Sequence, residues 1–133
     1  MHKYLYRVML IFISITVMTS YKCSAENLKF VDSVDDTGYY VDMDTVKIEA
    51  QNIIRAKIAI IKLNSKNYNK KHILLYNLRI NYKEQNYQVM SSTILAYETR
   101  EILEKDDNKK SVRSYAEDSP MFNVVKFILN GGK

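Results

Sequence analysis

Cysteine, histidine, glycine, proline and tryptophan are all scarce in this 133-residue chain. It has one cysteine, two histidines, one proline, three glycines and no tryptophan. A single cysteine excludes an intramolecular disulfide, so the stability of the fold must come from its core. So few histidine and cysteine side chains leave only carboxylates for a metal site, and we predict no metal and no cofactor. Repeats, low-complexity tracts and linkers are absent too, which predicts one domain.

The first 25 residues have the features of a cleaved signal peptide. Lys3 and Arg7 give a basic start, residues 8–18 are almost wholly apolar, and small residues lie at the predicted cut after Ala25. The apolar run is shorter than the roughly 20 residues that cross a bilayer. We therefore predict export to the periplasm or cell surface, no transmembrane anchor after cleavage, and a single domain over residues 26–133.

The formal charge of +5 overstates how basic the mature chain is. Lys3, Arg7 and Lys22 leave with the predicted signal peptide, which has no acidic residue, so 17 basic and 15 acidic residues remain. This near balance gives no whole-molecule electrostatic reason to bind nucleic acid, which an exported protein seldom meets. We therefore expect no nucleic-acid partner.

The segment 74–82 alternates more regularly than any other part of the chain. Period-two alternation is typical of a strand with one face on a core and one in water, so this segment is the predicted central strand. Asp42–Thr45 is expected to interrupt the strands around it. Asp35-Asp36-Thr37-Gly38 is the predicted turn of a hairpin, with a glycine free to take positive φ. The other strands are predicted over residues 30–34, 39–41, 46–49, 53–63, 87–97, 100–105 and 111–115.

The C-terminal segment 119–130 has the pattern of an amphipathic helix. Ser119 can cap free N–H groups, and Pro120 fits the first helical position, where no donor is lost. The predicted apolar arc consists of Met121, Phe122, Val124, Val125, Ile128 and Leu129. So wide an arc must be covered, and a sheet face is available. The predicted fold class is α+β, mainly β: a single antiparallel sheet of about six strands with a C-terminal α-helix packed on one face.

Several short motifs occur together in a recognisable order. They are Gly38-Tyr39-Tyr40-Val41-Asp42, the strand 53–63, a Tyr-x-Leu-x-Ile strand at 76–80, and Tyr115 before Ser119-Pro120 and the helix. This order resembles the surface-adhesin protein E family. The resemblance implies a small exported sheet with its helix on the concave face, and an outer-surface adhesin that binds host matrix and serum proteins.

Two features of this chain depart from that family. The best-known member ties its helix to the sheet by a disulfide, which this chain cannot form, and carries a tryptophan where Phe30 stands here. The implied fold survives both departures because the helix has its own apolar face. The implied adhesin activity gains less support, since one fold hosts many functions.

Two groups of basic residues are candidate binding sites. If strands 53–63 and 74–82 pair with both apolar faces inward, residues of equal parity oppose each other. The first group then lies on the outer face and consists of Arg55, Lys57 and Arg79. The second group lies in the loop between these strands and consists of Lys66, Lys70 and Lys71. Either could bind a polyanion such as a glycosaminoglycan or an anionic lipid headgroup; a solvated face and a solvated loop are the alternatives.

Groups that could support catalysis are sparse. His72 is the only histidine of the mature chain, and no nucleophile or carboxylate is spaced to act with it, so we predict no catalytic residue and no enzyme activity. The predicted function is an exported, non-enzymatic binding module of the cell envelope or surface. The sequence is compatible with a protein or polyanion partner and with a homodimer. The alternative is a structural or accessory periplasmic protein with a resident bacterial partner.

Overall fold

The computed structural model describes residues 27–62 and 71–133. The described elements, in chain order, are β1 (Leu28–Val34), β2 (Thr37–Ala50), β3 (Ile53–Lys62), β4 (His72–Asn81), β5 (Asn86–Ala96), β6 (Ile102–Asp106), β7 (Arg113–Ser114) and α2 (Pro120–Leu129). The predicted signal peptide, residues 1–25, lies outside the described residues. So do Lys66 and Lys70 of the predicted basic loop.

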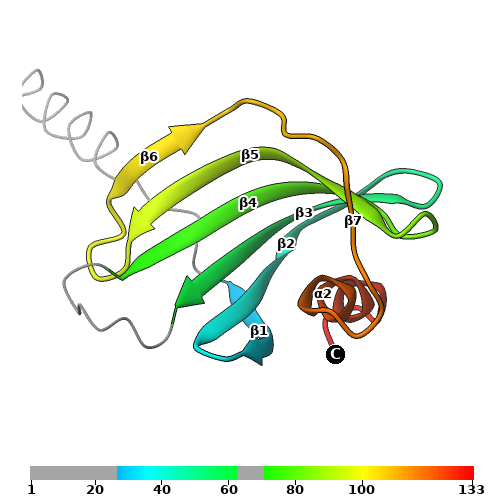
Figure 1. Cartoon of the computed structure of the whole chain (residues 1–133), viewed down its shortest axis with the longest axis horizontal. Helices are drawn as coiled ribbons and strands as arrows, with labels where there is room; N and C mark the ends of the chain where they lie inside the picture. Colours follow the sequence, from blue (N-terminus) through cyan, green and yellow to red (C-terminus); the bar gives the residue numbers. More distant parts are fainter. Residues whose placement is uncertain (1–26, 63–70) are drawn as a thin grey trace, which may run out of the picture.

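The described strands form one open antiparallel sheet (Figure 1). Strands β1 to β6 are neighbours in chain order, and β7 pairs with the start of β5 while β6 pairs with its end. The helix α2 lies on one face of the sheet, beside β1 and β2. This arrangement confirms the predicted fold class, and β4 is the predicted central strand.

Turns in this glycine-poor chain use other residues in the left-handed region. Positive φ occurs at Asp35 (53°), Asn52 (65°) and Gln85 (52°), which lie in the turns between β1 and β2, β2 and β3, and β4 and β5. The predicted hairpin turn is present at Asp35 and Asp36, and Asp35 takes the positive φ that Gly38 was free to adopt. Gly38 instead makes room for a neighbour, since a Cβ there would come within 2.9 Å of the Tyr40 ring.

The predicted interruption at Asp42–Thr45 is a shift of register inside one continuous strand. Strand β2 runs through this segment, and its pairing with β3 shifts between Asp42 and Lys47. Side chains replace the missing ladder bonds: the Thr45 hydroxyl accepts the Lys57 N–H at 2.9 Å and donates to the Asp42 carbonyl at 2.7 Å. The predicted strands 39–41 and 46–49 are therefore parts of one strand, because these bonds carry it past the irregularity.

The helix begins and ends where the sequence predicts. The Ser119 hydroxyl oxygen accepts the Phe122 N–H at 3.2 Å, Pro120 occupies the first turn, and Gly131 follows the helix with φ of 73°. The Asn123 amide also donates to the Asp32 carboxylate of β1 at 2.8 Å. One member of the predicted apolar arc is not covered: Leu129, at the end of the helix, is 52% exposed.

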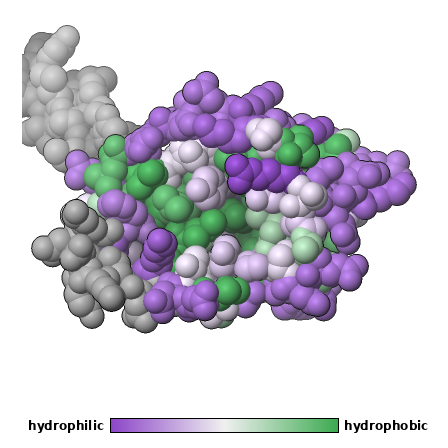
Figure 2. Space-filling view, viewed as in Figure 1, coloured by the Kyte–Doolittle hydropathy of each residue, from purple (hydrophilic) through white to green (hydrophobic). Residues whose placement is uncertain are grey.

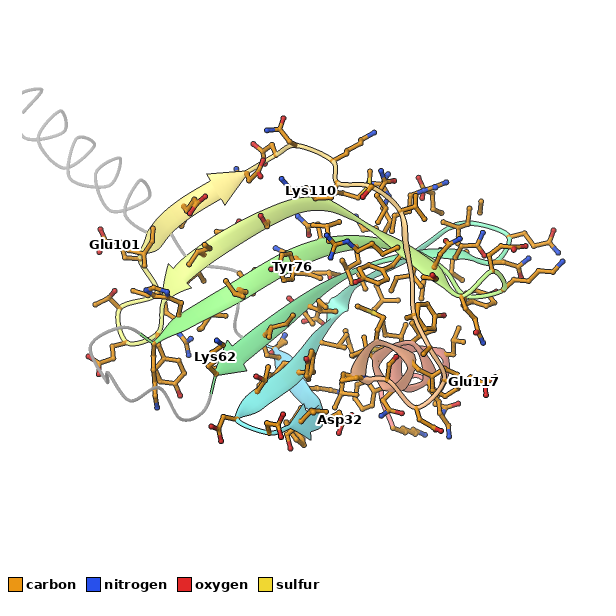
Figure 3. All side chains as sticks on the ribbon, in the orientation of Figure 1. Asp32, Lys62, Tyr76, Glu101, Lys110 and Glu117 are labelled. Atoms are coloured by element: carbon orange, nitrogen blue, oxygen red, sulfur yellow. The ribbon has the colours of Figure 1, made fainter. Side chains whose placement is uncertain are left out.

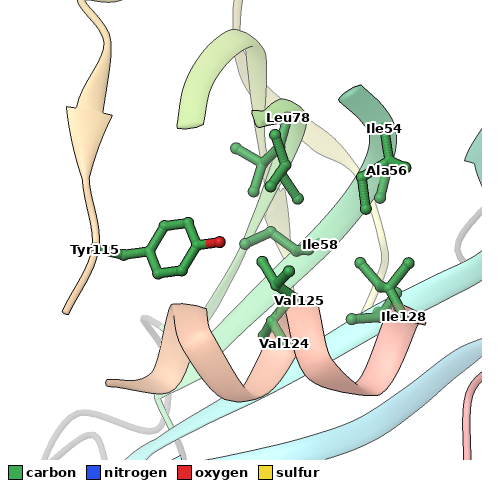
Figure 4. Close-up of a cluster of buried hydrophobic side chains, with 10 residues drawn as sticks. Ile54, Ala56, Ile58, Leu78, Tyr115, Val124, Val125 and Ile128 are labelled. Carbon is green, nitrogen blue, oxygen red and sulfur yellow. The ribbon is translucent and has the colours of Figure 1, made fainter. Parts of the chain in front are cut away.

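The main core lies between α2 and the sheet (Figure 4). Its buried members are Val41, Ile54, Ala56, Ile58, Leu78, Ile80, Tyr115, Val124, Val125 and Ile128. Tyr115 enters this core from the segment before the helix, and burial raises the pKa of its hydroxyl. A second, smaller cluster of buried residues consists of Ala59, Ile61, Ile73, Leu75 and Leu95.

The second cluster lies on the face opposite the helix. Ala59 pairs with Leu75 and Ile61 with Ile73, at positions that alternate with the helix-facing residues of β3 and β4. The two strands are therefore apolar on both faces at this end. At the other end of the same strands, the face opposite the helix carries charged residues.

Candidate functional site

The first predicted basic group is brought together on the face opposite the helix. In the register of β3 and β4, Arg55 lies directly opposite Arg79, and Lys57 lies opposite Asn77. Equal-parity pairing is therefore confirmed. Two guanidinium groups on directly opposed positions repel each other unless an acid or an anion lies between them.

Glu49, from the end of β2, lies between the two arginines. One of its carboxylate oxygens lies 3.1 Å from the Arg55 guanidinium, and the other lies 2.7 Å from Nε of Arg79. Hydrogen bonds from Arg55 first and Arg79 second hold the pKa of Glu49 below its usual value. Sequence reasoning missed this bridge because the register shift in β2 decides which residue reaches the arginines.

A basic hollow of about 400 Å³ lies next to this bridge. Two irregular strands shape it: β2 shifts register at Asp42–Lys47, and β5 carries the extra residue Met90 opposite the Asn77–Leu78 step of β4. Its lining residues are Asp44, Thr45, Lys47, Arg55, Ala56, Lys57, Asn77, Leu78, Met90 and Ser91. These irregular segments of β2 and β5 therefore border the hollow on either side of β3 and β4.

The charges around the basic hollow do not cancel. Among the residues that the structure describes, no carboxylate forms an ion pair with Lys47 or Lys57. Asp44, the acid that lines the hollow, accepts a hydrogen bond from the Asn27 amide. Glu49 is shared between two arginines, and Asp44 is one acid beside two lysines. The cations therefore outnumber the acids that line or bridge this hollow, and an anionic group would meet an excess of positive charge there.

Lys71, the described member of the second predicted basic group, lies far from the basic hollow. Lys71 precedes β4, and its Nζ lies 5.3 Å from the centre of the Tyr97 ring, which Arg100 also approaches at 5.2 Å. Arg79 lies eight residues along the same strand, or roughly 27 Å away at 3.4 Å per residue. Lys71 and the basic hollow are therefore separate sites, and Lys66 and Lys70 fall outside the described residues.

A second hollow, which sequence reasoning missed, lies on the helix-bearing face. Figure 2 shows it as a recessed hydrophobic area inside a hydrophilic rim. This apolar hollow has a volume of about 400 Å³ and is lined by Ile58, Ile60, Tyr76, Leu78, Tyr87, Val89, Ser92, Lys110, Ser111, Arg113 and Met121. Tyr76 points from the middle of β4 onto this face (Figure 3). Lys110 lies on the segment that joins β6 to β7, beside β5.

A signal for the apolar hollow does exist in the sequence. The ten residues of α2 span about 15 Å, whereas the ten or eleven residues of β3, β4 and β5 extend about 34 Å. A helix of this length cannot cover the whole apolar face of these strands. Comparing the predicted lengths of helix and strands would have indicated an uncovered apolar area.

Groups for metal binding do not gather in the described part of the chain. Residues 27–62 and 71–133 contain no group of three or more histidine, cysteine or acidic side chains that could hold a metal ion. His72 is exposed at the start of β4. Within the same ranges, no helix has the length and apolar character needed to cross a membrane.

Comparison with known proteins adds no relative to this description. No protein-family model matches the chain, and no curated protein matches its sequence. The resemblance to the surface-adhesin protein E family rests on the sequence motifs alone, so it stays a prediction.

Proposed function

We propose that this protein is an exported, non-enzymatic binding module of the bacterial cell envelope or surface. One observation carries the proposal: Arg55 and Arg79, paired across two strands and bridged by Glu49, lie beside a hollow that also presents Lys47 and Lys57. The sheet holds these side chains on a rigid surface. A rigid surface binds with less loss of conformational entropy than a loop would.

The partner we propose for this face is an acidic protein surface or a sulfated polysaccharide. Both arginines can present paired N–H donors to a sulfate or carboxylate, which suits bidentate recognition. The lysines add charge without fixed geometry. The signal-peptide pattern of residues 1–25 favours a partner outside the cytoplasm, and the family resemblance favours host matrix or serum proteins.

Heparin is a suitable probe for this face because it is a soluble sulfated polyanion. We expect the Arg55→Ser, Lys57→Ser, Arg79→Ser triple variant to bind heparin roughly tenfold more weakly at low salt, with the difference shrinking as salt screens the charges. Glu49→Gln should bind more tightly than wild type, because it releases both guanidinium groups while the charge of the face becomes more positive. Titration calorimetry of the three proteins measures both effects.

Two outcomes would reject the proposed face. Equal binding by the wild type and the triple variant would show that heparin binds elsewhere, and an unchanged affinity in Glu49→Gln would show that the bridged arginines take no part. Lys83→Ser, an exposed change in the turn before β5, is the matched control for loss of one positive charge. Protease treatment of intact cells tests location, since protection until the outer membrane is opened would favour a resident periplasmic partner.

A further inference from the structure

The apolar hollow on the helix-bearing face has a floor of continuous apolar rows. Residues paired across strands share a face, so Ile58 and Tyr76 form one row with Ser92, and Leu78 and Val89 form the next. Met121 of α2 closes one side. The floor residues Ile60, Tyr76 and Val89 are only half-buried, so a bound apolar group would remove further apolar surface from water.

The rim of this hollow carries two cations, held in place by backbone contacts. Arg113 is paired with Tyr87 in the β5–β7 register, and the Lys110 N–H donates to the Val89 carbonyl at 2.9 Å. Nζ of Lys110 lies 2.8 Å from Asp106, and the pKa of that carboxyl is lowered mainly by this contact. Among the described residues, no acid pairs with Arg113. The rim therefore presents one uncompensated guanidinium and one shared ammonium.

The polar groups inside the hollow are too few for a peptide. The floor is the face of a sheet, so its backbone N–H and C=O groups are already used in strand pairing, and the lining hydroxyls are those of Ser92, Ser111 and two tyrosines. A peptide backbone placed there would leave its own polar groups unpaired, which is unfavourable. A chain without polar groups along its length has no such cost.

We propose that the apolar hollow binds a single-chain aliphatic carboxylate of the fatty-acid class. The alkyl chain lies along Tyr76 and Val89, and the carboxylate lies at the rim near Arg113 and Lys110. The volume of about 400 Å³ is at the lower end for small-molecule sites, which suits one chain rather than two. This site is on the opposite face from the basic hollow and is independent of the proposed binding of a polyanion.

Dodecanoate, octanoate and dodecan-1-ol are the probes, titrated by calorimetry into the protein as recovered from cells. We expect dodecanoate to bind more tightly than octanoate by up to roughly fourfold for each additional buried methylene. In the Lys110→Ser, Arg113→Ser variant, dodecanoate should bind roughly three- to tenfold more weakly while dodecan-1-ol is unchanged, because only the carboxylate uses the cations. Both cations are exposed, so this variant should keep the fold.

The matched control is Arg55→Ser, Lys57→Ser, which removes two cations from the opposite face and should leave dodecanoate affinity unchanged. Val89→Asp places a charge in the floor and should abolish binding of both twelve-carbon probes. Absence of dodecanoate binding overturns the proposal. So does equal affinity in the wild type and the rim variant, or a dimer that Val89→Asp dissociates in a protein that does not bind dodecanoate, since a second copy would then occupy the hollow.

Discussion

The helix-bearing face and the opposite face of the sheet use the same strands in different ways. On the helix-bearing face, apolar rows continue along β3 and β4 beyond the reach of α2, and the excess forms the apolar hollow. On the opposite face, these strands change character along their length, from the buried Ala59 and Ile73 to the charged Arg55 and Arg79. Alternation in the sequence therefore predicts which residues share a face of the sheet. What covers that face depends on the lengths and ends of other elements.

The largest expected effect tests whether the helix-bearing face depends on α2. Ile128 is 6% exposed in the main core, so Ile128→Asp would bury an unpaired charge and should lower the free energy of unfolding by about 3–5 kcal/mol. Leu129→Asp is the matched control, because Leu129 is the next residue in sequence but is 52% exposed. This change should alter stability by less than about 0.5 kcal/mol. Chemical denaturation of both variants checks this, and similar midpoints would contradict the packing of α2.

A second change tests whether the opposite face has a core of its own. Ile73 is fully buried in the second cluster, so Ile73→Ala should cost about 2–4 kcal/mol from lost burial and the resulting cavity. Ile102 lies on the edge strand β6 and is 59% exposed, so Ile102→Ala removes the same atoms from a solvated site. If the two alanine variants unfold at the same denaturant concentration, the second cluster is not a core and only the helix-bearing face stabilises the sheet.

Much of this fold follows from local sequence signals. The cap at Ser119, the proline in the first turn and the glycines after the helix fixed its bounds, and the parity of β3 and β4 predicted that Arg55 opposes Arg79. These signals are local or periodic, so the sequence displays them directly. The register shift in β2 that brings Glu49 to the arginines depends instead on bonds from Thr45 to a neighbouring strand, which no periodicity reveals.

The candidate sites divide in the same manner. Arg55, Lys57 and Arg79 were predicted as a group because strand pairing alone brings them together. The rim of the apolar hollow was not predicted. Lys110 comes from an irregular segment and Arg113 from the two-residue strand β7, and both are placed by contacts with β5. Sequence reasoning also treated the whole apolar face as core, because it compared patterns of hydrophobicity and not the lengths of the elements.

A third prediction separates the packing of α2 from its capping. Ser119→Ala removes the acceptor for the Phe122 N–H and should lower stability by about 1 kcal/mol, well below the effect of Ile128→Asp. Ser119→Asp keeps an acceptor at this position and should recover most of the loss. Thermal unfolding followed by far-UV circular dichroism measures the change. An alanine variant as stable as wild type would mean that packing on the helix-bearing face alone holds the first turn.

The smallest expected effect concerns the bridge on the opposite face. The pKa of Glu49 is lowered in the folded state, so its ion pairs with Arg55 and Arg79 stabilise the fold above the usual carboxyl pKa of 4.5, and this stabilisation is lost as the pH falls through the lower, folded-state pKa. Because the bridge is exposed, Glu49→Gln should lower the Tm by only about 1–3 °C at neutral pH and low salt. The difference from wild type should vanish in acid below this folded-state pKa, where both proteins lack the charge.

Glu117→Gln is the control for this measurement, since Glu117 is exposed and forms no ion pair with the described residues. It removes the same charge without releasing two guanidinium groups, so its Tm should match wild type at both pH values. A Glu49→Gln deficit that persists in acid would mean that the carboxylate acts by packing and not by charge. In that case Glu49 does not bridge Arg55 and Arg79 through its charge, and an external anion could not take its place between the two guanidinium groups.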